Sequence, residues 1–168
     1  MTNSGAVIAN GGKVVITAQA AGKVLDRTIN MKGIVEARSV GVRNGEIILG
    51  DGSGTIRVSG KLIASGRSSG SKGGVVKVLA KRIIIKKKAV ISVAGDQGGG
   101  SIYIGGNYQG KGPLPNADSV YVAKGAKINA DAVTKGNGGT VIVWSDQVTQ
   151  AYGSISAKGG LLGGNGGF

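Results

Sequence analysis

The side chains available for chemistry are limited, because the chain contains no histidine and no cysteine. A Ser-His-Asp triad, a cysteine nucleophile, a disulfide framework and a Cys/His zinc site are therefore excluded. Enzymes that cleave polysaccharides gather carboxylates on one face as acid–base pairs. The eight carboxylates here are Asp26, Glu36, Glu46, Asp51, Asp96, Asp118, Asp131 and Asp146. They are spread between glycine-rich turns and strand ends, so we predict no catalytic residue, no metal site and no cofactor.

Basic residues dominate the charge of the chain. Lysine and arginine number 21 against 8 acidic residues, which gives a net charge of +13 and predicts attraction to polyanions. No acidic residue lies between Ser53 and Gly95, where the basic residues are densest, Lys72 included. Within that stretch, the predicted binding residues for glycans or other polyanions are Lys77, Lys81, Arg82, Lys86, Lys87 and Lys88. The alternative is a solvated outer face whose charge prevents lateral strand association.

A second candidate site is the segment from Asn107 to Asn116, which contains two prolines, Tyr108 and Lys111. Loops on rigid scaffolds often carry recognition, so Tyr108 and Lys111 are predicted recognition residues. The alternative is an ordered flap that covers one sheet, with Tyr108 and Leu114 packed on its outer surface.

The elements that would position these residues form a repeat. Glycine supplies 34 of the 168 residues, which disfavours helices. A glycine pair followed by alternating aliphatic residues recurs at irregular intervals, with a weaker second copy, at residues 11–16, 44–49, 73–78, 99–104 and 138–143. Two further strand-like pieces follow each copy, and alternation of β-branched residues favours strands over helices. The middle pieces centre on residues 29–31, 56–58, 83–85, 120–122 and around 148, and the third pieces on residues 35–37, 62–64, 91–93, 128–130 and 155–157.

Stacking like strand on like strand predicts an all-β fold, a right-handed parallel β-helix of about five coils with three strands each. The chain would be one segment, with coils at approximately residues 11–44, 45–72, 73–98, 99–137 and 138–165. One inward file would contain Val14, Ile47, Val76, Ile102 and Val141. The alternative, a sandwich of short antiparallel strands, does not explain why each unit starts with the glycine pair.

The same register predicts an outward apolar stripe on the first sheet. Its members are Val15, Ile48, Lys77, Tyr103 and Ile142, with Trp144 beside them. Such a stripe is either a docking face or a surface covered by a flap of the same chain or by flanking sequence.

Several segments resemble the filamentous-haemagglutinin-type exoproteins, which are large bacterial adhesins or toxin carriers exported by two-partner secretion. The resemblance is clear over about residues 89–168. Residues 1–88 share only the spacing of the repeat. The segments are GGSIYIGGNYQGKGPLPNA (99–117), INADA (128–132), GNGGTVIVWSD (136–146) and GSISAKGG (153–160). The resemblance implies a parallel β-helix from the shaft of a secreted or surface-held exoprotein, together with an outer-membrane transporter partner.

The two ends of the sequence agree with an internal fragment. Residues 1–5 have neither a basic stretch nor an apolar region and do not form a signal peptide, and no apolar run is long enough to span a membrane. A sixth unit begins at Gly166 and stops at Phe168, so we expect the β-helix to be truncated at its C-terminal end.

We therefore expect a structural and adhesive rod, secreted or held at the bacterial cell surface, that mediates attachment to host cells or surfaces and is not an enzyme. Its expected partners are host-cell surface glycans or other polyanions, the outer-membrane transporter and the rest of the same exoprotein. The alternatives are a polysaccharide-processing enzyme on a β-helix scaffold, the shaft of a contact-dependent toxin delivery protein and a basic nucleic-acid-binding scaffold. The chain has only six aromatic residues for base stacking, which weakens the last alternative.

Overall fold

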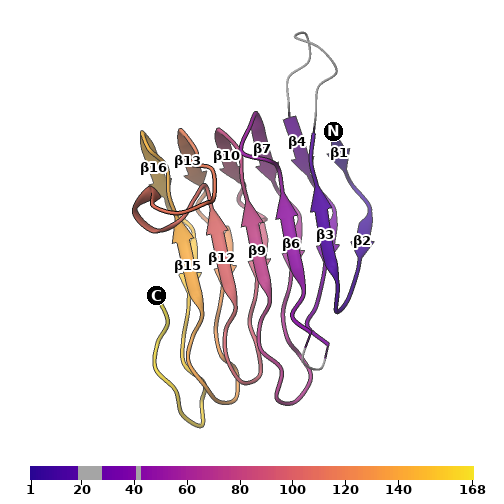
Figure 1. The fold of residues 1–168 in the computed structure, drawn as a ribbon, viewed down its shortest axis with the longest axis vertical. Coiled ribbons are helices and arrows are strands. Elements are labelled where there is room, and N and C mark those ends of the chain that lie inside the picture. The colour runs from indigo at the N-terminus through magenta and orange to yellow at the C-terminus, as the bar shows by residue number, and fades with distance from the viewer. Residues whose placement is uncertain (19–27, 41–42) are drawn as a thin grey trace.

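The computed structural model describes residues 1–18, 28–40 and 43–168. Strands follow one another around a common axis and stack in successive coils, which gives a parallel β-helix (Figure 1). All pairings between the named strands are parallel. The predicted fold class, an all-β parallel solenoid of about five three-stranded coils, is confirmed.

Each coil contributes one strand to each of three sheets, which we name A, B and C in chain order. Sheet A contains β1 (Thr2–Asn3), β4 (Thr28–Met31), β7 (Thr55–Val58), β10 (Arg82–Ile85), β13 (Ser119–Val122) and β16 (Val148–Ala151). Sheet B contains β2 (Ala6–Ile8), β5 (Ile34–Glu36), β8 (Lys61–Ile63), β11 (Val90–Ser92), β14 (Lys127–Asn129) and β17 (Ser154–Ser156). Sheet C contains β3 (Lys13–Ile16), β6 (Glu46–Leu49), β9 (Val75–Val78), β12 (Ser101–Ile104) and β15 (Thr140–Val143).

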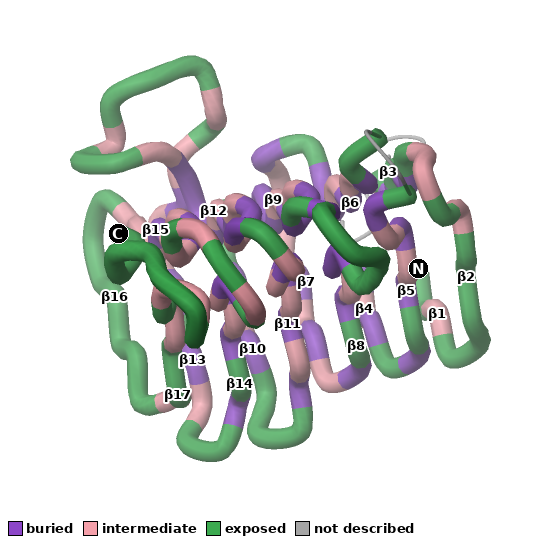
Figure 2. The backbone as a smooth tube through the Cα atoms, turned by 90° about the horizontal axis from the view of Figure 1, so that it is seen from below, coloured by how far each residue is buried: buried purple, intermediate pink, exposed green. Residues whose placement is uncertain are grey.

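The alternation of aliphatic and polar residues places one face of every strand in the interior. In sheet C the register pairs Val14 with Ile47, Ile47 with Val76, Val76 with Ile102 and Ile102 with Val141. The predicted inward file is therefore confirmed as continuous. Figure 2 shows the buried residues lining the inside of the coils and the exposed ones concentrated in the turns and at both ends.

Close backbone packing explains the recurring glycine pair. A Cβ atom on Gly100 would lie 2.0 Å from the carbonyl oxygen of Gly74, and one on Gly139 would lie 2.0 Å from that of Gly100. In the later pairs the second glycine, Gly74, Gly100 or Gly139, thus stacks directly on its counterpart in the preceding coil, with no space for a side chain. The glycine pair is a steric requirement of the corner where the chain enters sheet C.

Two short strands, β1 and β2, were not predicted from the sequence. They precede the first glycine pair and pair with β4 and β5. Apart from Asn3, which is partly buried, their residues are exposed, because this coil has a neighbour on one side only in the structure. In the described residues, no helix is long and apolar enough to cross a membrane, and helical structure is confined to a 3-10 turn at Tyr108–Gly110.

Candidate functional site

The first two residues of the predicted basic cluster form ion pairs. The Lys77 Nζ atom projects from sheet C and lies 2.8 Å from a carboxylate oxygen of Glu46, which also pairs with Lys13 at 2.9 Å. The Lys81 Nζ atom lies 3.3 Å from a carboxylate oxygen of Asp118. Their charges are therefore less available to a distant ligand than their position in the sequence indicates.

The fold also separates the remaining members of that cluster. Arg82 is the first residue of β10 and lies beside Thr55 and Ser119 on the outer face of sheet A. Lys86, Lys87 and Lys88 follow β10 in the turn between sheets A and B, and all three side chains are exposed. The basic segment thus runs from sheet C across sheet A to the turn before sheet B, and three of its lysines lie together in that turn.

Other coils bring further lysines to the same corner. Turns between sheets A and B line one edge of the solenoid as exposed loops (Figure 2). Lys32 and Lys124 lie in such turns, and Lys61 and Lys127 are the first residues of β8 and β14. We call the seven exposed lysines of this corner the lysine edge: Lys32, Lys61, Lys86, Lys87, Lys88, Lys124 and Lys127.

The register fixes the spacing of the lysine edge. Lys61 and Lys127 both pair with Val90, one from each side, so they stand two coils or about 10 Å apart. The backbone nitrogen of Lys86 donates a hydrogen bond to the carbonyl oxygen of Val58, which stacks this turn on the preceding one. Among the described residues, no salt bridge includes a lysine of this edge, and the A-to-B turns contain no carboxylate. Seven like charges in one row repel one another, and a polyanion would relieve that repulsion.

Four members of the lysine edge were missed from the sequence: Lys32, Lys61, Lys124 and Lys127. They lie outside the densest basic segment, and no two of them are adjacent in the sequence. The available signal was the position in the repeat, because each stands at or just before the start of the third strand of its unit. Superposing the repeats would have aligned them.

The segment from Asn107 to Asn116, which we call the flap, is fixed against the next coil. One carboxylate oxygen of Asp146 accepts hydrogen bonds from the Trp144 indole at 3.0 Å and from the Asn116 amide at 3.1 Å. The Tyr108 ring meets the Phe168 ring edge to face, with centroids 5.1 Å apart. Tyr108 remains half exposed, and the Lys111 ammonium donates to the Gln109 side chain at 3.2 Å. The segment is ordered as a flap, and its role in recognition stays a prediction.

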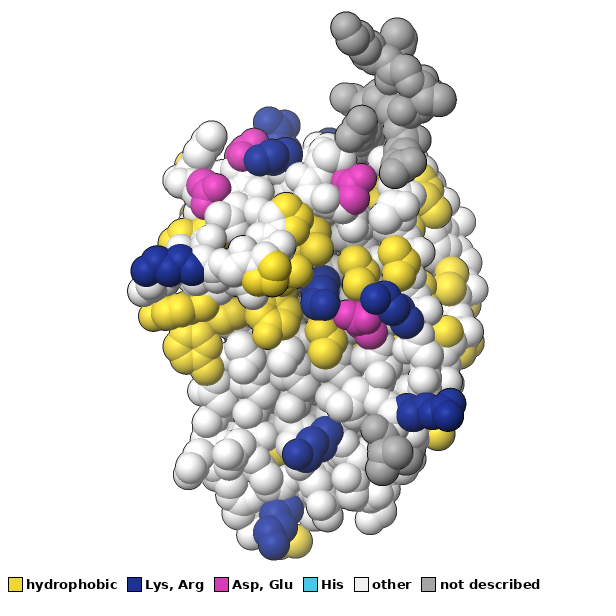
Figure 3. All heavy atoms as spheres, viewed as in Figure 1, with side chains coloured by type: hydrophobic (Ala, Val, Ile, Leu, Met, Phe, Trp, Pro, Cys, Tyr) yellow, Lys and Arg dark blue, Asp and Glu magenta, His cyan; other side chains and the backbone are white. Residues whose placement is uncertain are grey.

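The predicted outward stripe of sheet C exists, because Val15, Ile48, Lys77, Tyr103 and Ile142 follow one another in register. Its two ends differ: Ile142 is 6% exposed and Val15 is 54% exposed. Side chains of the flap and Phe168 border a hollow of about 430 Å³ above Ile142. Figure 3 shows hydrophobic side chains gathered on this face of the molecule. The flap therefore covers one end of the stripe.

The carboxylates of the described residues have structural partners rather than one another. The Asp131 side chain accepts from the Ser156 hydroxyl at 2.6 Å and from the Lys158 backbone nitrogen at 2.7 Å. Asp51 accepts from Ser53, and Asp26 lies outside the described residues. No group of three acidic residues that could hold a metal ion occurs within residues 1–18, 28–40 and 43–168.

Hydrogen bonds lower the pKa of three of these carboxylates. A hydrogen bond from Lys77 lowers the pKa of Glu46, assisted by Lys13 and opposed by partial burial. A hydrogen bond from Arg38 likewise lowers the pKa of Glu36. The Thr134 hydroxyl and the Gly70 backbone N–H lower the pKa of Asp96. A general acid needs a raised pKa, so these shifts suit structural ion pairs better than catalysis.

The whole described fold resembles that of a solved structure. The chain is similar to the HMW1 secretion domain from Haemophilus influenzae, with 30% sequence identity and a TM-score of 0.81. The match covers 99% of this chain and 42% of that domain, so the chain spans about two fifths of the domain's length. No protein-family model and no curated protein matches the sequence.

Proposed function

We propose that this chain is a rod-like segment of a large exported bacterial exoprotein that attaches to anionic glycans on host cells or other surfaces. The observation that carries the proposal is the uninterrupted three-sheet solenoid, matched over 99% of its length by the secretion domain of HMW1. Export by two-partner secretion would make an outer-membrane transporter the partner, and the product would be secreted or held at the cell surface. The resemblance to the filamentous-haemagglutinin type points the same way.

The mechanism follows from the stacked coils. A rod that repeats one edge every coil offers many weak contacts at once, and linked contacts give a strength that none has alone. The lysine edge provides such contacts, because its members are exposed and come from four successive coils. Lys86, Lys87 and Lys88 are at its centre, and Lys77, Lys81 and Arg82 of the predicted cluster would add weaker attraction from the adjoining faces.

Chromatography on immobilised heparin tests this attachment. We expect retention above about 0.5 M salt, where charges are screened over about 4 Å and diffuse attraction is lost. A sulfonate cation exchanger of equal charge density controls for net charge, and we expect elution from it at lower salt. Elution from heparin below physiological salt, or equal elution from both resins, would contradict glycan attachment.

A matched pair of triple variants locates the contact. Lys86→Gln, Lys87→Gln and Lys88→Gln together remove three charges from the lysine edge. Lys72→Gln, Lys135→Gln and Lys158→Gln remove three exposed charges from the loops between sheets B and C. We expect the first set to reduce heparin retention strongly and the second set to reduce it slightly, with both folded by circular dichroism. Equal losses would mean that only net charge matters, and stronger retention on DNA than on heparin would favour a nucleic-acid scaffold instead.

A further inference from the structure

A groove runs along the outer face of sheet B, next to the lysine edge. Two hollows of about 350 and 360 Å³ share the residues Ser65, Arg67 and Ser92, so they form one continuous depression. It extends from Ile34 on β5 to Val133 in the loop after β14. The groove therefore crosses several coils along the axis of the rod, as an extended chain-like ligand would.

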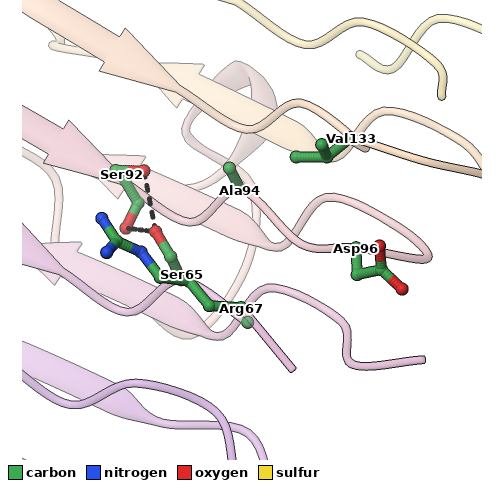
Figure 4. Close-up of a pocket in the computed structure, with 7 residues that line it drawn as sticks. Ser65, Arg67, Ser92, Ala94, Asp96 and Val133 are labelled. Carbon is green, nitrogen blue, oxygen red and sulfur yellow. Dashed lines mark hydrogen bonds between the residues drawn. The ribbon is translucent and has the colours of Figure 1, made fainter. Parts of the chain in front are cut away.

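The floor of the groove combines hydroxyl groups with aliphatic side chains. The Ser65 and Ser92 hydroxyl oxygens lie 2.8 Å apart and share a hydrogen bond (Figure 4). Ile63, Val90 and Ala94 provide apolar surface beside them. A sugar ring presents the same mixture, with C–H groups on its faces and hydroxyl groups on its rim, so the floor is chemically suited to one.

One guanidinium of the groove, that of Arg67, makes no salt bridge with any described residue, although its charge is one of the smaller causes that lower the pKa of Glu36. Arg38 is committed to Glu36, with Nε and Nη2 at 2.6 and 3.0 Å from its two carboxylate oxygens. Asp96 accepts hydrogen bonds from Thr134 and Gly70. Within the described part of the chain, Arg67 has no ion pair. Figure 4 shows its side chain reaching back over the floor toward Ser92, away from the Asp96 carboxylate.

Each margin of the groove carries a basic residue, and the margin toward sheet C also carries Asp96. Arg67 borders it on the side of the loops to sheet C, and Lys61 of the lysine edge borders it on the other. A guanidinium binds a carboxylate through two parallel hydrogen bonds, whereas an ammonium acts as a point charge. Arg67 can therefore distinguish a carboxylate by its geometry, whereas the lysines of the lysine edge attract any anion.

We propose that this groove binds a uronate unit of an acidic polysaccharide, a sugar ring that carries its own carboxylate. Arg67 would receive the carboxylate in a bidentate pair, Ser65 and Ser92 would bond ring hydroxyls, and Lys61 would contact the next anionic group. The inference rests on the proposed attachment to anionic glycans and deepens it. It assigns selectivity for carboxylated sugars to the sheet B face and general polyanion attraction to the lysine edge.

Calorimetric titration with an oligogalacturonate of defined length tests the groove, with heparin retention measured in parallel. Arg67→Lys keeps the positive charge but removes the planar guanidinium, and we expect it to weaken oligogalacturonate binding about tenfold. Retention on dextran sulfate, which carries sulfate groups but no uronate, should change little. Arg57→Lys, on the outer face of sheet A, is the matched control and should leave oligogalacturonate binding unchanged. Melting curves of all variants establish that the fold is intact.

The outcomes separate this inference from the proposed function. Heparin retention without oligogalacturonate binding would contradict the proposed uronate site in the groove but would leave the proposed attachment to glycans unaffected. Equal oligogalacturonate binding by the wild type and Arg67→Lys would also overturn it, because the lysines would then suffice. Loss of heparin retention but not of oligogalacturonate binding in the Lys86, Lys87 and Lys88 triple variant would support two distinct sites.

Discussion

Val78 and Val143 occupy the same inward file of sheet C, two coils apart, yet they differ in burial. The register pairs each of them with Ile104, which lies between them. Val78 is completely buried, whereas Val143 is partly exposed. The two residues have the same side chain and the same direction, so the difference comes from the number of neighbouring coils. At the C-terminal end of sheet C, burial is therefore supplied by the adjacent coil rather than by the local sequence.

The same contrast extends to the other sheets. Ile91 in the middle of sheet B is fully buried, whereas Ile155 near its end is 45% exposed. All four residues of β16 are exposed, although its counterpart β10 buries two isoleucines. The middle coils should therefore determine global stability, and the end coils should open at lower cost.

The largest effect is expected from the glycine ladder of the middle coils. Gly100→Ala would place a methyl group against the backbone of Gly74, and no rotamer change can relieve this contact. We expect a loss of about 3 kcal/mol or more in unfolding free energy, measured by urea denaturation. Gly5→Ala is the control, because its Cβ would meet only the Asn3 side chain at 4.0 Å, and its cost should be below about 0.5 kcal/mol. Similar costs at both positions would refute the steric explanation of the glycine pair.

The valine pair tests the comparison directly. Val78→Ala removes buried methyl groups that have coils on both sides, so we expect it to cost about 2 kcal/mol. Val143→Ala removes the same atoms from a partly exposed position and should cost about 1 kcal/mol or less. Urea denaturation of both variants gives the two values. A cost for Val143→Ala as large as that for Val78→Ala would show that burial is not set by the neighbouring coils.

The flap covers part of sheet C near its C-terminal end, where no further coil is stacked among the described residues. Asp146→Ala removes the acceptor that holds both Trp144 and Asn116, so the flap should detach more often. We expect trypsin to cleave after Lys111 several-fold faster, with a change in Tm of only a few degrees. Asp131→Ala, in a loop between sheets B and C, is the control for loss of a carboxylate that accepts two hydrogen bonds. An unchanged cleavage rate would mean that other contacts, such as Tyr108 on Phe168, hold the flap.

A smaller, pH-dependent effect is expected at Glu46, which joins β6 to Lys13 and Lys77 on its two sides. Its pKa is lowered in the folded state, so it contributes stability above the pKa of an unfolded glutamate and loses it as the pH falls through the lower folded value. The contribution should be below about 1 kcal/mol, because all three side chains are partly exposed. Glu46→Gln should flatten the decline of stability below about pH 4, measured by thermal unfolding. An unchanged pH dependence of stability would mean that Glu46 and its two lysines do not contribute to stability.

Tyr108→Ala separates packing from recognition in the flap. The edge-to-face contact with Phe168 predicts a Tm lower by a few degrees at most, because Tyr108 is half exposed. Unchanged attachment to cells would leave Tyr108 as a packing residue only, whereas reduced attachment with an unchanged Tm would favour recognition.

The strands, their inward faces and their register could be predicted from the sequence, because they depend on its periodicity. Alternation of Val76 and Val78, or of Ile102 and Ile104, marks strands whose inward faces must be buried, and the glycine pairs set the register between them. The strands β1 and β2 were not predicted, because Thr2–Asn3 is too short to show alternation and Ala6–Ile8 is an unbroken apolar run. The cover over Ile142 depends on where the flap folds back, which no local pattern specifies. The lysine edge depends on superposing distant turns, so the local density of charge pointed instead to Lys77 and Lys81, which are ion-paired.

Distances between spin labels test the central claim, the in-register stacking of the coils. The chain has no cysteine, so single cysteines at Ala6 and Ser154 can be labelled cleanly. Both residues are exposed and stand at the two ends of one file of sheet B, five coil steps apart. Stacked coils predict a narrow distance distribution centred near 24 Å for this pair. For labels at Ile34 and Ser154 the distance should be shorter by about 5 Å. A broad distribution, or the same distance for both pairs, would contradict the stacked solenoid.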